Sequence, residues 1–361
     1  TLSSTAKFTP DVGIEGTSYT ISVNNYANPE SGFTWTYFAD TMVITAKGSN
    51  GVTDIVSGTS TNDSSIDLIF TPSADTPDFT VDNIIVRSGG GIVSRERITA
   101  FNPFLWTKLG DDIYGEAADD QSGYSVSLSN DGSTVAIGAN GNDGNGSNSG
   151  HVRIYEYSGN SWTQLGAGID GEATNNSGIS VSLSSDGSTV AIGRWDTPVR
   201  IYRYSENSWT SLGLGIIGGV DGDSWGRSVS LSENGSTVAI GANGNDGNGA
   251  DSGHVRIYQW NATSPAAGSW GQIGEDIDGE EAGDGSGVSV SLSSDGRTVA
   301  IGANGNDGNG ADSGHVRIYQ WNATDELWDQ LGLDIDGAES DDESGVSVSL
   351  SSDGLTVAIG A

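Results

Sequence analysis

The sequence predicts an all-β protein whose second part is a repeated antiparallel structure. The first observation is a strand-like cassette that recurs through residues 106–361 at a period of roughly 50 residues. The second is that no window shows apolar residues at the 3.6-residue spacing of an amphipathic helix. Each repeat contains enough strand-like segments for four strands, and repeated four-stranded units of this length are typical of β-propeller blades.

The elements of one repeat follow from residue alternation. In Ser289–Ser293, valine and leucine alternate with serine, which predicts a half-buried strand. Thr298–Gly302 is apolar on both faces, as expected for a strand between neighbouring sheets. Asp295-Gly296 lies between them and tolerates the positive φ of a tight turn, so the two strands form a hairpin. Val316–Tyr319 and a short strand at Trp328 complete the blade.

The repeats predict a propeller domain over residues 96–361, with about five blades. The units are 106–161, 162–208, 209–269, 270–327 and 328–361. The segments 96–101 and 106–110 align without gaps on 152–157 and 162–166, so we expect strands from 96–110 to complete the last blade and close the ring. The alternative is a larger ring of which these repeats are one part.

The repeated motif resembles the FG-GAP repeat of integrin-α-like propellers. The resemblance is carried by Ser-Gly before the first strand, as at Ser286-Gly287, and by Gly-Ala-Asn after the second, as at Gly302–Asn304. It covers about residues 105–361 and implies a propeller, usually of seven blades. The phenylalanine and proline of the family motif are replaced here, and the loop that often holds calcium is shortened to Asp-Gly. The resemblance therefore implies no calcium site in that loop.

Residues 1–95 form a separate predicted domain. Strand-like segments lie at 18–23, 42–46, 66–70 and 79–86, separated by glycine, serine, asparagine, aspartate and proline. Their spacing is typical of a small antiparallel sandwich. The phrases Phe70-Thr71-Pro72 and Phe79–Ile84 resemble bacterial-type Ig-like modules of large surface proteins.

Composition restricts the partners and the location. A formal net charge of −34 disfavours binding to nucleic acids or anionic membranes, and no apolar stretch is long enough to insert into a membrane. Cysteine is absent, which excludes disulfides and thiol catalysis. Acidic loops rich in asparagine, serine and glycine, together with the family resemblance, predict an extracellular or cell-surface protein. Glycosylation sequons occur at Asn62, Asn145, Asn175, Asn234, Asn261 and Asn322.

The residues that usually carry catalysis follow the repeat. His151, His254 and His315 occupy one slot, Ser-Gly-His-Val-Arg-Ile-Tyr. A catalytic site needs one arrangement of unlike groups, so a repeated histidine is expected to pack or form hydrogen bonds instead. No serine stands in a Gly-x-Ser-x-Gly nucleophile motif, and no paired carboxylates stand apart from the repeat. The sequence predicts a protein that is not an enzyme.

Glycine-rich loops after the second strand offer hard oxygen ligands, which suit Ca²⁺. The alternative is a solvated turn in which asparagine and aspartate bond to their own backbone. The candidate ligands are Asn243, Asn245, Asp246, Asp251, Asn304, Asn306, Asp307 and Asp312.

Two places break the repeat symmetry. Arg194-Trp195 stands where sibling repeats have the long loop, and Trp225 with Arg227 replaces a Ser-Gly-x tripeptide. These residues are predicted to form a contact patch for carbohydrate or protein. The alternative is neutral drift among repeats.

The function predicted from these features is a non-enzymatic extracellular structural or adhesion protein. Its partners are other surface proteins or glycans, or copies of itself in an appendage or filament. The alternatives are a virion or tail-fibre component and a propeller enzyme acting on glycans.

Overall fold

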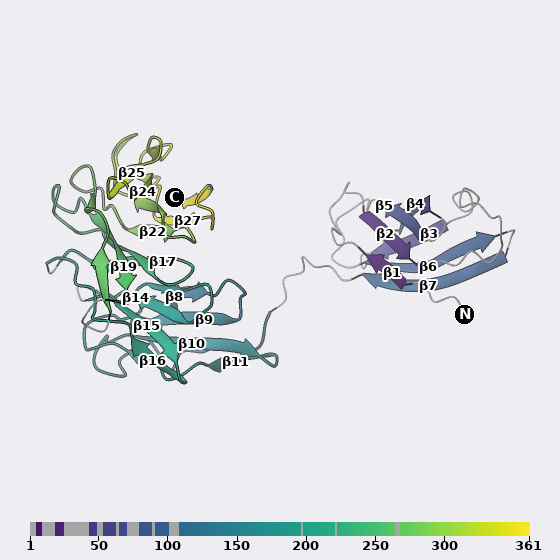
Figure 1. The fold of residues 1–361 in the computed structure, drawn as a ribbon, viewed down its shortest axis with the longest axis horizontal. Helices are drawn as coiled ribbons and strands as arrows, with labels where there is room; N and C mark the ends of the chain where they lie inside the picture. Colours follow the sequence, from purple (N-terminus) through teal and green to yellow (C-terminus); the bar gives the residue numbers. More distant parts are fainter. Residues whose placement is uncertain are drawn as a thin grey trace. The chain divides into compact units, whose positions relative to one another are not determined.

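The computed structural model describes residues 108–361 except 196–197, 221 and 264–267, and the strands β1–β7 in the preceding region. The chain divides into two compact units, Thr1–Lys108 and Leu109–Ala361 (Figure 1). All elements described in both units are β-strands. Within the described residues, no helix is long and apolar enough to cross a membrane.

The described residues of the first unit form seven strands in the order β1-β2-β5-β4-β3-β6-β7. The predicted strands correspond to β2, β3, β5 and β6, while β1 and β4 were missed. The Ig-like assignment stays a prediction. The bounds are β1 Thr5–Phe8, β2 Tyr19–Asn24, β3 Val43–Gly48, β4 Thr53–Asn62, β5 Ser65–Phe70, β6 Phe79–Ser88 and β7 Gly91–Ala100.

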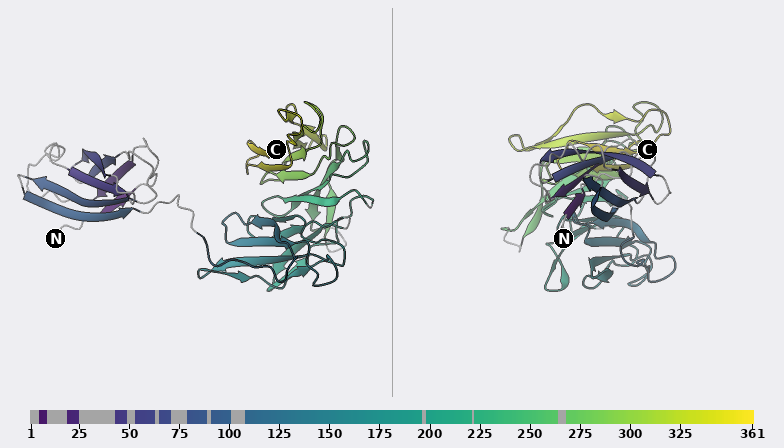
Figure 2. Two further views of the ribbon diagram at one scale, coloured as in Figure 1. Left: turned by 180° about the vertical axis from the view of Figure 1, so that it is seen from behind. Right: turned by 90° about the vertical axis from the view of Figure 1, so that its right-hand side faces the viewer.

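The second unit is propeller-like, because it is built from four antiparallel sheets whose main path has four strands, followed by a hairpin (Figures 1 and 2). The predicted blades are therefore confirmed as sheets. The first two sheets contain β8 Ser122–Leu128, β9 Thr134–Ala139, β10 His151–Ser158, β11 Ser161–Gln164 and β12 Ile169–Asp170, then β13 Val181–Leu183, β14 Thr189–Ile192, β15 Arg200–Ser205 and β16 Ser208–Ser211. The third and fourth contain β17 Trp225–Leu231, β18 Thr237–Ala242, β19 His254–Asn261, β20 Ser269–Gln272 and β21 Ile277–Asp278, then β22 Ser289–Leu292, β23 Thr298–Ala303, β24 His315–Asn322, β25 Leu327–Gln330 and β26 Ile335–Asp336. The hairpin consists of β27 Ser347–Leu350 and β28 Val357–Gly360.

Each Asp-Gly turn is fixed by its own side chains. The Asp295 carboxylate accepts bonds from the Ser293 hydroxyl at 2.7 Å and the Arg297 amide at 3.0 Å. Gly296 follows at φ +68°, a conformation that glycine adopts without a steric penalty. The last serine of the Ser-Val-Ser-Leu-Ser motif is therefore a turn residue, and the predicted hairpin is confirmed.

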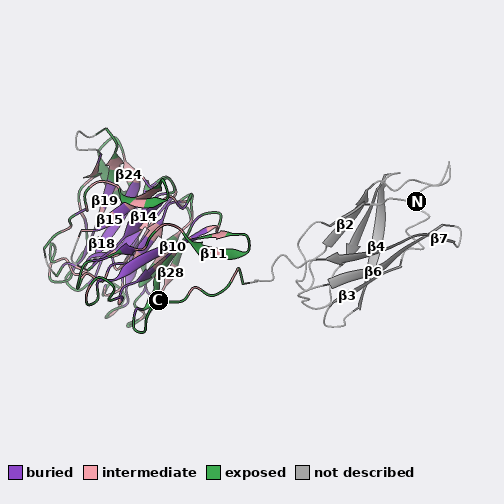
Figure 3. Cartoon of the chain, turned by 90° about the horizontal axis from the view of Figure 1, so that it is seen from below, coloured by how far each residue is buried: buried purple, intermediate pink, exposed green. Residues whose placement is uncertain are grey.

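The hydrophobic core lies between consecutive sheets (Figure 3). In the third core cluster, Ala239 and Ile257 of one sheet pack with Val290, Leu292 and their neighbours of the next. The other two clusters join the first sheet to the second, and the second to the third, with residues in equivalent slots. Each blade is thus stabilised mainly by the sheets on either side of it.

The remaining two serines of the motif connect the sheets. The Ser228 hydroxyl donates to the Gly287 carbonyl of the next sheet at 2.8 Å, and the Ser230 hydroxyl accepts from the Leu292 amide at 3.0 Å. Gly241 lies against the same Gly287 carbonyl, where a Cβ would overlap the oxygen. The two glycines of the repeated motif are therefore in contact across each junction.

The repeated tryptophans bridge consecutive sheets. Trp209 Nε1 donates to the Leu165 carbonyl of the preceding sheet at 2.8 Å, and Trp270 Nε1 donates to the Leu212 carbonyl at 2.9 Å. Each of these tryptophans lies on the last strand of the main path of its sheet. The structural unit therefore ends after the tryptophan, whereas the predicted units begin with it.

The predicted strand exchange is wrong. Residues 96–100 belong to β7, which pairs along β6 in the first unit. The hairpin β27–β28 forms a two-stranded sheet. Glu96–Ala100 bonds to β6 because the two strands are joined by a short local connection, whereas the predicted closure needs a distant partner.

Candidate functional site

Three buried histidines of the second unit each lie within 4.0 Å of one or two carboxylates. His151, His254 and His315 begin the third strand of their sheets and are buried. Two residues after each histidine the sequence has an arginine, namely Arg153, Arg256 and Arg317. Because side chains alternate across a strand, each histidine and its arginine lie on the same face.

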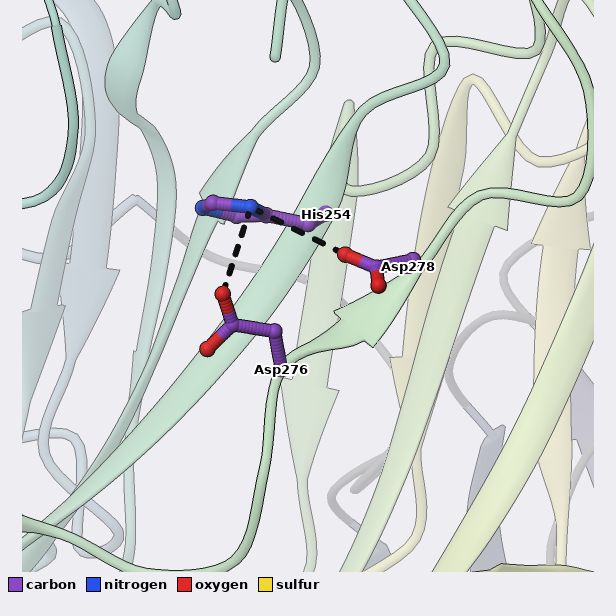
Figure 4. Close-up of side chains that lie close together, drawn as sticks. All are labelled: His254, Asp276 and Asp278. Carbon is purple, nitrogen blue, oxygen red and sulfur yellow. Dashed lines mark ion pairs between the residues drawn. The ribbon is translucent and has the colours of Figure 1, made fainter. Parts of the chain in front are cut away.

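His254 faces two carboxylates contributed from the connection to the next sheet (Figure 4). Its Nδ1 lies 3.9 Å from Asp276 Oδ2 and 4.0 Å from Asp278 Oδ1. Asp278 is brought there by β21, which pairs with β19 beside the histidine. Arg256 donates to both oxygens of Asp276 at 2.8 Å, so this carboxylate already has a bidentate partner.

The next junction repeats the arrangement with one change. His315 Nδ1 lies 3.9 Å from Asp334 Oδ2 and 3.9 Å from Glu280 Oε2. In the first sheet, His151 Nδ1 lies 3.7 Å from Oε2 of Glu116, which precedes β8. The Nε2 atoms of all three histidines are buried without a hydrogen-bond partner among the described atoms.

Burial disfavours the charged form of these histidines. Desolvation lowers the pKa of His254 and of His315 below the ordinary value, and the adjacent arginine lowers it further. The nearby carboxylates oppose this shift without reversing it. The pKa of Asp276 is itself lowered, since its bonds from Arg256 and Gln272 outweigh the opposing effect of burial.

Two of these clusters have the composition of a metal site. Three ligand atoms lie within 4.8 Å of one another in His254, Asp276 and Asp278, and again in Glu280, His315 and Asp334. One imidazole and two carboxylates suit a transition metal better than calcium, which prefers six to eight oxygens. Arg256 holds Asp276 of the first cluster in a bidentate pair, and Arg317 Nη1 lies 3.7 Å from Glu280 Oε1 of the second, so one carboxylate of each cluster already has a partner within the protein.

The loops predicted to hold calcium bond largely to themselves. Asn306 Oδ1 accepts from the Gly308 amide and Asp307 Oδ1 from the Asp312 amide, both at 2.8 Å. Asn245 Oδ1 and Asp246 Oδ1 accept equivalent bonds at 2.9 Å. Asn243 and Asn304 stand at the turns that open these loops, and Asp251 supplies its backbone amide to Asp246. This geometry matches the self-bonded turn, while calcium binding stays a prediction.

The structure divides the predicted contact patch. Trp225 is only 2% exposed and belongs to the core shared by the second and third sheets. Its Nε1 donates to the Ile216 carbonyl at 2.9 Å, and its ring meets those of His254 and Tyr258 edge-on. Trp225 is therefore a packing residue, and its ring is not available to a surface ligand.

The other three predicted contact residues also differ in how far their side chains are exposed. Arg194 is buried, and desolvation lowers its pKa. Trp195 is 48% exposed, with its amide bonded to the Asn175 carbonyl at 2.9 Å. Arg227 has intermediate exposure. Of the four predicted contact residues, Trp195 is the one that presents a large surface to solvent.

An exposed apolar group escaped the sequence analysis. Leu214, Ile217 and Val220 are 88%, 72% and 75% exposed. We name them the third-unit patch, after the third predicted repeat unit, 209–269. They occupy the slots that hold Glu275, Asp278 and Glu281 one repeat later, three acidic residues. Comparing the copies slot by slot would have found them. Leu214 and Ile217 also line a cavity of about 290 Å³ with Ile216, Tyr258 and Trp270.

The predicted glycosylation sites lie in turns and loops and at the ends of strands. Asn145, Asn234 and Asn261 are exposed, while Asn175 and Asn322 have intermediate exposure. Asn62 ends β4, in the region whose side chains are not described. Several of these side chains are bonded, for example Asn145 Nδ2 to the Gly171 carbonyl at 2.7 Å. Glycosylation stays a prediction.

Comparison with known proteins supports the repeat. Residues 115–155 and 218–258 match the FG-GAP repeat. These segments run from the approach to the first strand through the third strand of the first and third sheets. No curated protein matches the chain. Similar solved structures include proposed 6-phosphogluconolactonases from Bacteroides uniformis ATCC 8492 and Bacteroides fragilis NCTC 9343, each with a TM-score of 0.45. The first is 10% identical, over 94% of this chain and 84% of that one, and the second 9%, over 95% and 84%.

Proposed function

We propose that this protein is a non-enzymatic structural or adhesion protein of the cell exterior, whose propeller-like unit binds other surface proteins or glycans. The third-unit patch is the observation that carries the proposal. On a chain with net charge −34, it places three exposed apolar side chains in slots that are all acidic in the following repeat. Exposed apolar side chains gathered in one short segment are a feature of interaction sites.

The chemistry of the junctions supports the same function. The histidines, arginines and carboxylates recur in equivalent slots, and they pair with one another. Such groups stabilise a scaffold, whereas catalysis needs one unsymmetrical set of groups. The exposed Trp195 adds an aromatic side chain of the type that stacks on sugar rings or packs in protein interfaces.

An adhesion assay tests this function. Beads coated with the protein are measured for attachment to a panel of purified surface proteins and polysaccharides. We expect attachment to at least one, and its loss in the variant Leu214→Glu, Ile217→Asp, Val220→Glu, which introduces the acidic residues found in these slots in the following repeat. Leu333→Glu is the matched control, because Leu333 is 90% exposed in the slot equivalent to Leu214.

Two outcomes would contradict the proposal. One is the absence of attachment to every surface in the panel. The other is attachment that the patch variant leaves unchanged while its thermal midpoint also stays unchanged. Because the three side chains are already in solvent, their replacement is expected to alter stability by less than about 0.5 kcal/mol each.

A further inference from the structure

The histidine of the fourth sheet lies where separate segments of the second unit meet. His315 begins β24 and is 1% exposed. Glu280 belongs to the connection that leads from the third sheet to the fourth, and Asp334 to the connection between β25 and β26. One oxygen of each carboxylate lies 3.9 Å from His315 Nδ1, and the three ligand atoms lie within 4.8 Å of one another. Three side chains from different parts of the chain thus converge on one point.

Among the described residues, no hydrogen bond holds the His315 ring in this position. Nε2 is buried without a hydrogen-bond partner. The carboxylate oxygens that face Nδ1 are 3.9 Å away, which is longer than a hydrogen bond. Because burial disfavours the charged form of the ring, attraction between an imidazolium and the carboxylates does not explain the contact either. The ring therefore presents an unpaired nitrogen to two carboxylates, which costs free energy unless a group lies between them.

The described cationic side chains do not balance the charge at this point. Arg317 Nη1 lies 3.7 Å from Glu280 Oε1, whereas the oxygen that faces His315 is Oε2. Asp334 Oδ1 accepts from the neutral amide of Gln330 at 2.6 Å, and its Oδ2 faces the histidine. Two carboxylates therefore share one arginine beside a ring that burial keeps from charging, so a further cation is electrostatically favoured there.

We propose that Glu280, His315 and Asp334 bind a divalent transition-metal ion such as Zn²⁺. Imidazole nitrogen and carboxylate oxygen are both ligands of this class of ion, whereas calcium and magnesium prefer a shell of oxygens. Zn²⁺ bonds of about 2.1 Å place tetrahedral ligand atoms about 3.4 Å apart, so each oxygen needs to approach Nδ1 by about 0.5 Å. The Glu280 and Asp334 side chains are 45% and 28% exposed, so small torsional changes supply this movement.

The first sheet has only part of this arrangement. His151 faces Glu116, which stands in the slot of Glu280. Gly168 takes the slot of Asp334, so the second carboxylate is missing from that slot. The repeat therefore keeps the histidine without keeping the three ligands, which means that the ligand set at the fourth sheet is not a general requirement of the fold.

The third sheet has the ligands together with a competitor (Figure 4). Asp276 and Asp278 face His254 at 3.9 and 4.0 Å. Both oxygens of Asp276 accept from Arg256 at 2.8 Å, so an ion here has to compete with a bidentate pair. Of the three histidines of the chain, His315 alone faces two carboxylates neither of which is held in this way.

An ion bound at His315 joins the connection after the third sheet to the third strand of the fourth. Because the three ligands are brought together only in the folded chain, the ion binds the native state in preference to the unfolded one and stabilises it. The ligands are separate from the third-unit patch, so this metal site adds to the proposed adhesion without depending on it.

The test is the retention of Zn²⁺ by the whole chain, measured by equilibrium dialysis in the presence of excess Mg²⁺. Mg²⁺ screens the diffuse negative charge of a chain with net charge −34, but it competes poorly for a site that contains imidazole. We expect Zn²⁺ to be retained and to raise the thermal midpoint. Complete displacement of Zn²⁺ by Mg²⁺ would overturn the proposal.

Two variants identify the ligands. Glu280→Gln and Asp334→Asn each remove a ligand charge with little change of shape, and each should weaken Zn²⁺ binding by more than about tenfold, since even changes beyond the direct ligands have effects of this size. Glu281→Gln is the matched control, because this exposed neighbour undergoes the same change of charge and should bind as the wild type does. Equal weakening in all three variants would show diffuse attraction and overturn the site. The replaced side chains are partly or largely exposed, so circular dichroism should show the variants folded.

A further variant distinguishes the two clusters. Asp278→Asn alters a carboxylate that faces His254 and should leave Zn²⁺ binding unchanged. Loss of Zn²⁺ in this variant, with retention in Glu280→Gln and Asp334→Asn, would assign the ion to His254 and overturn the site at His315. The triple variant of the third-unit patch should keep the ion while it loses attachment, so failure of the metal site and failure of adhesion are recognised separately.

Discussion

Trp225→Ser is the sharpest test of whether the odd tryptophan packs or binds. Serine is what the sibling repeats carry at Ser177 and Ser286, so the change is locally compatible with the repeat. Trp225 is 2% exposed, and its ring contacts the core of two sheets. Removing a buried tryptophan costs about 3–5 kcal/mol, including the cavity that is left. The lost bond to the Ile216 carbonyl, 2.9 Å long, adds about 1 kcal/mol.

The assay is denaturant unfolding followed by far-ultraviolet circular dichroism, which does not depend on the missing indole. Trp195→Ser is the matched control, since that side chain is 48% exposed and its replacement should cost less than about 1 kcal/mol. Equal small losses in both variants would refute the packing role. A large loss of unfolding free energy confined to Trp225→Ser would establish that the tryptophan that breaks the repeat here stabilises the core.

Three other predictions concern the junctions. Ser230→Ala should cost about 1–3 kcal/mol, because it leaves the next sheet's amide without its acceptor, and Ser349→Ala on the hairpin should cost almost nothing; denaturant unfolding compares them. Gly241→Ala should lower the thermal midpoint, since its Cβ would overlap a carbonyl oxygen of the following sheet. Gly360→Ala should be milder, because the nearest group is a serine hydroxyl, and equal shifts would contradict this account. Burial lowers the pKa of His254 below about 6.5, so the unfolded chain binds the proton more readily and stability falls as pH drops below that value; His254→Gln should flatten this fall in the free energy of unfolding, and an unchanged slope would exclude the histidine as its cause.

Much of the second unit was predictable because its signals are local. The alternation in Ser289–Ser293 and the double-sided apolar run in Thr298–Gly302 depend on strand geometry, and both became strands. The positive φ of Gly296 follows from its place in a tight turn. Repetition then implied that neighbouring four-stranded sheets pack on one another as blades.

The sequence by itself therefore determined the all-β class, the strands of each repeat and the chemistry of its turns. Only the tertiary structure decided which side chains are covered, because burial depends on whether another sheet lies opposite. Val126 and Val181 have the same local sequence context, yet one is exposed and the other buried. Trp225 and Trp195 both depart from the repeat in sequence. In the structure Trp225 lies in the core between two sheets, whereas Trp195 is exposed to solvent. The partner of residues 96–100 was decided in the same way, by β6 lying beside them.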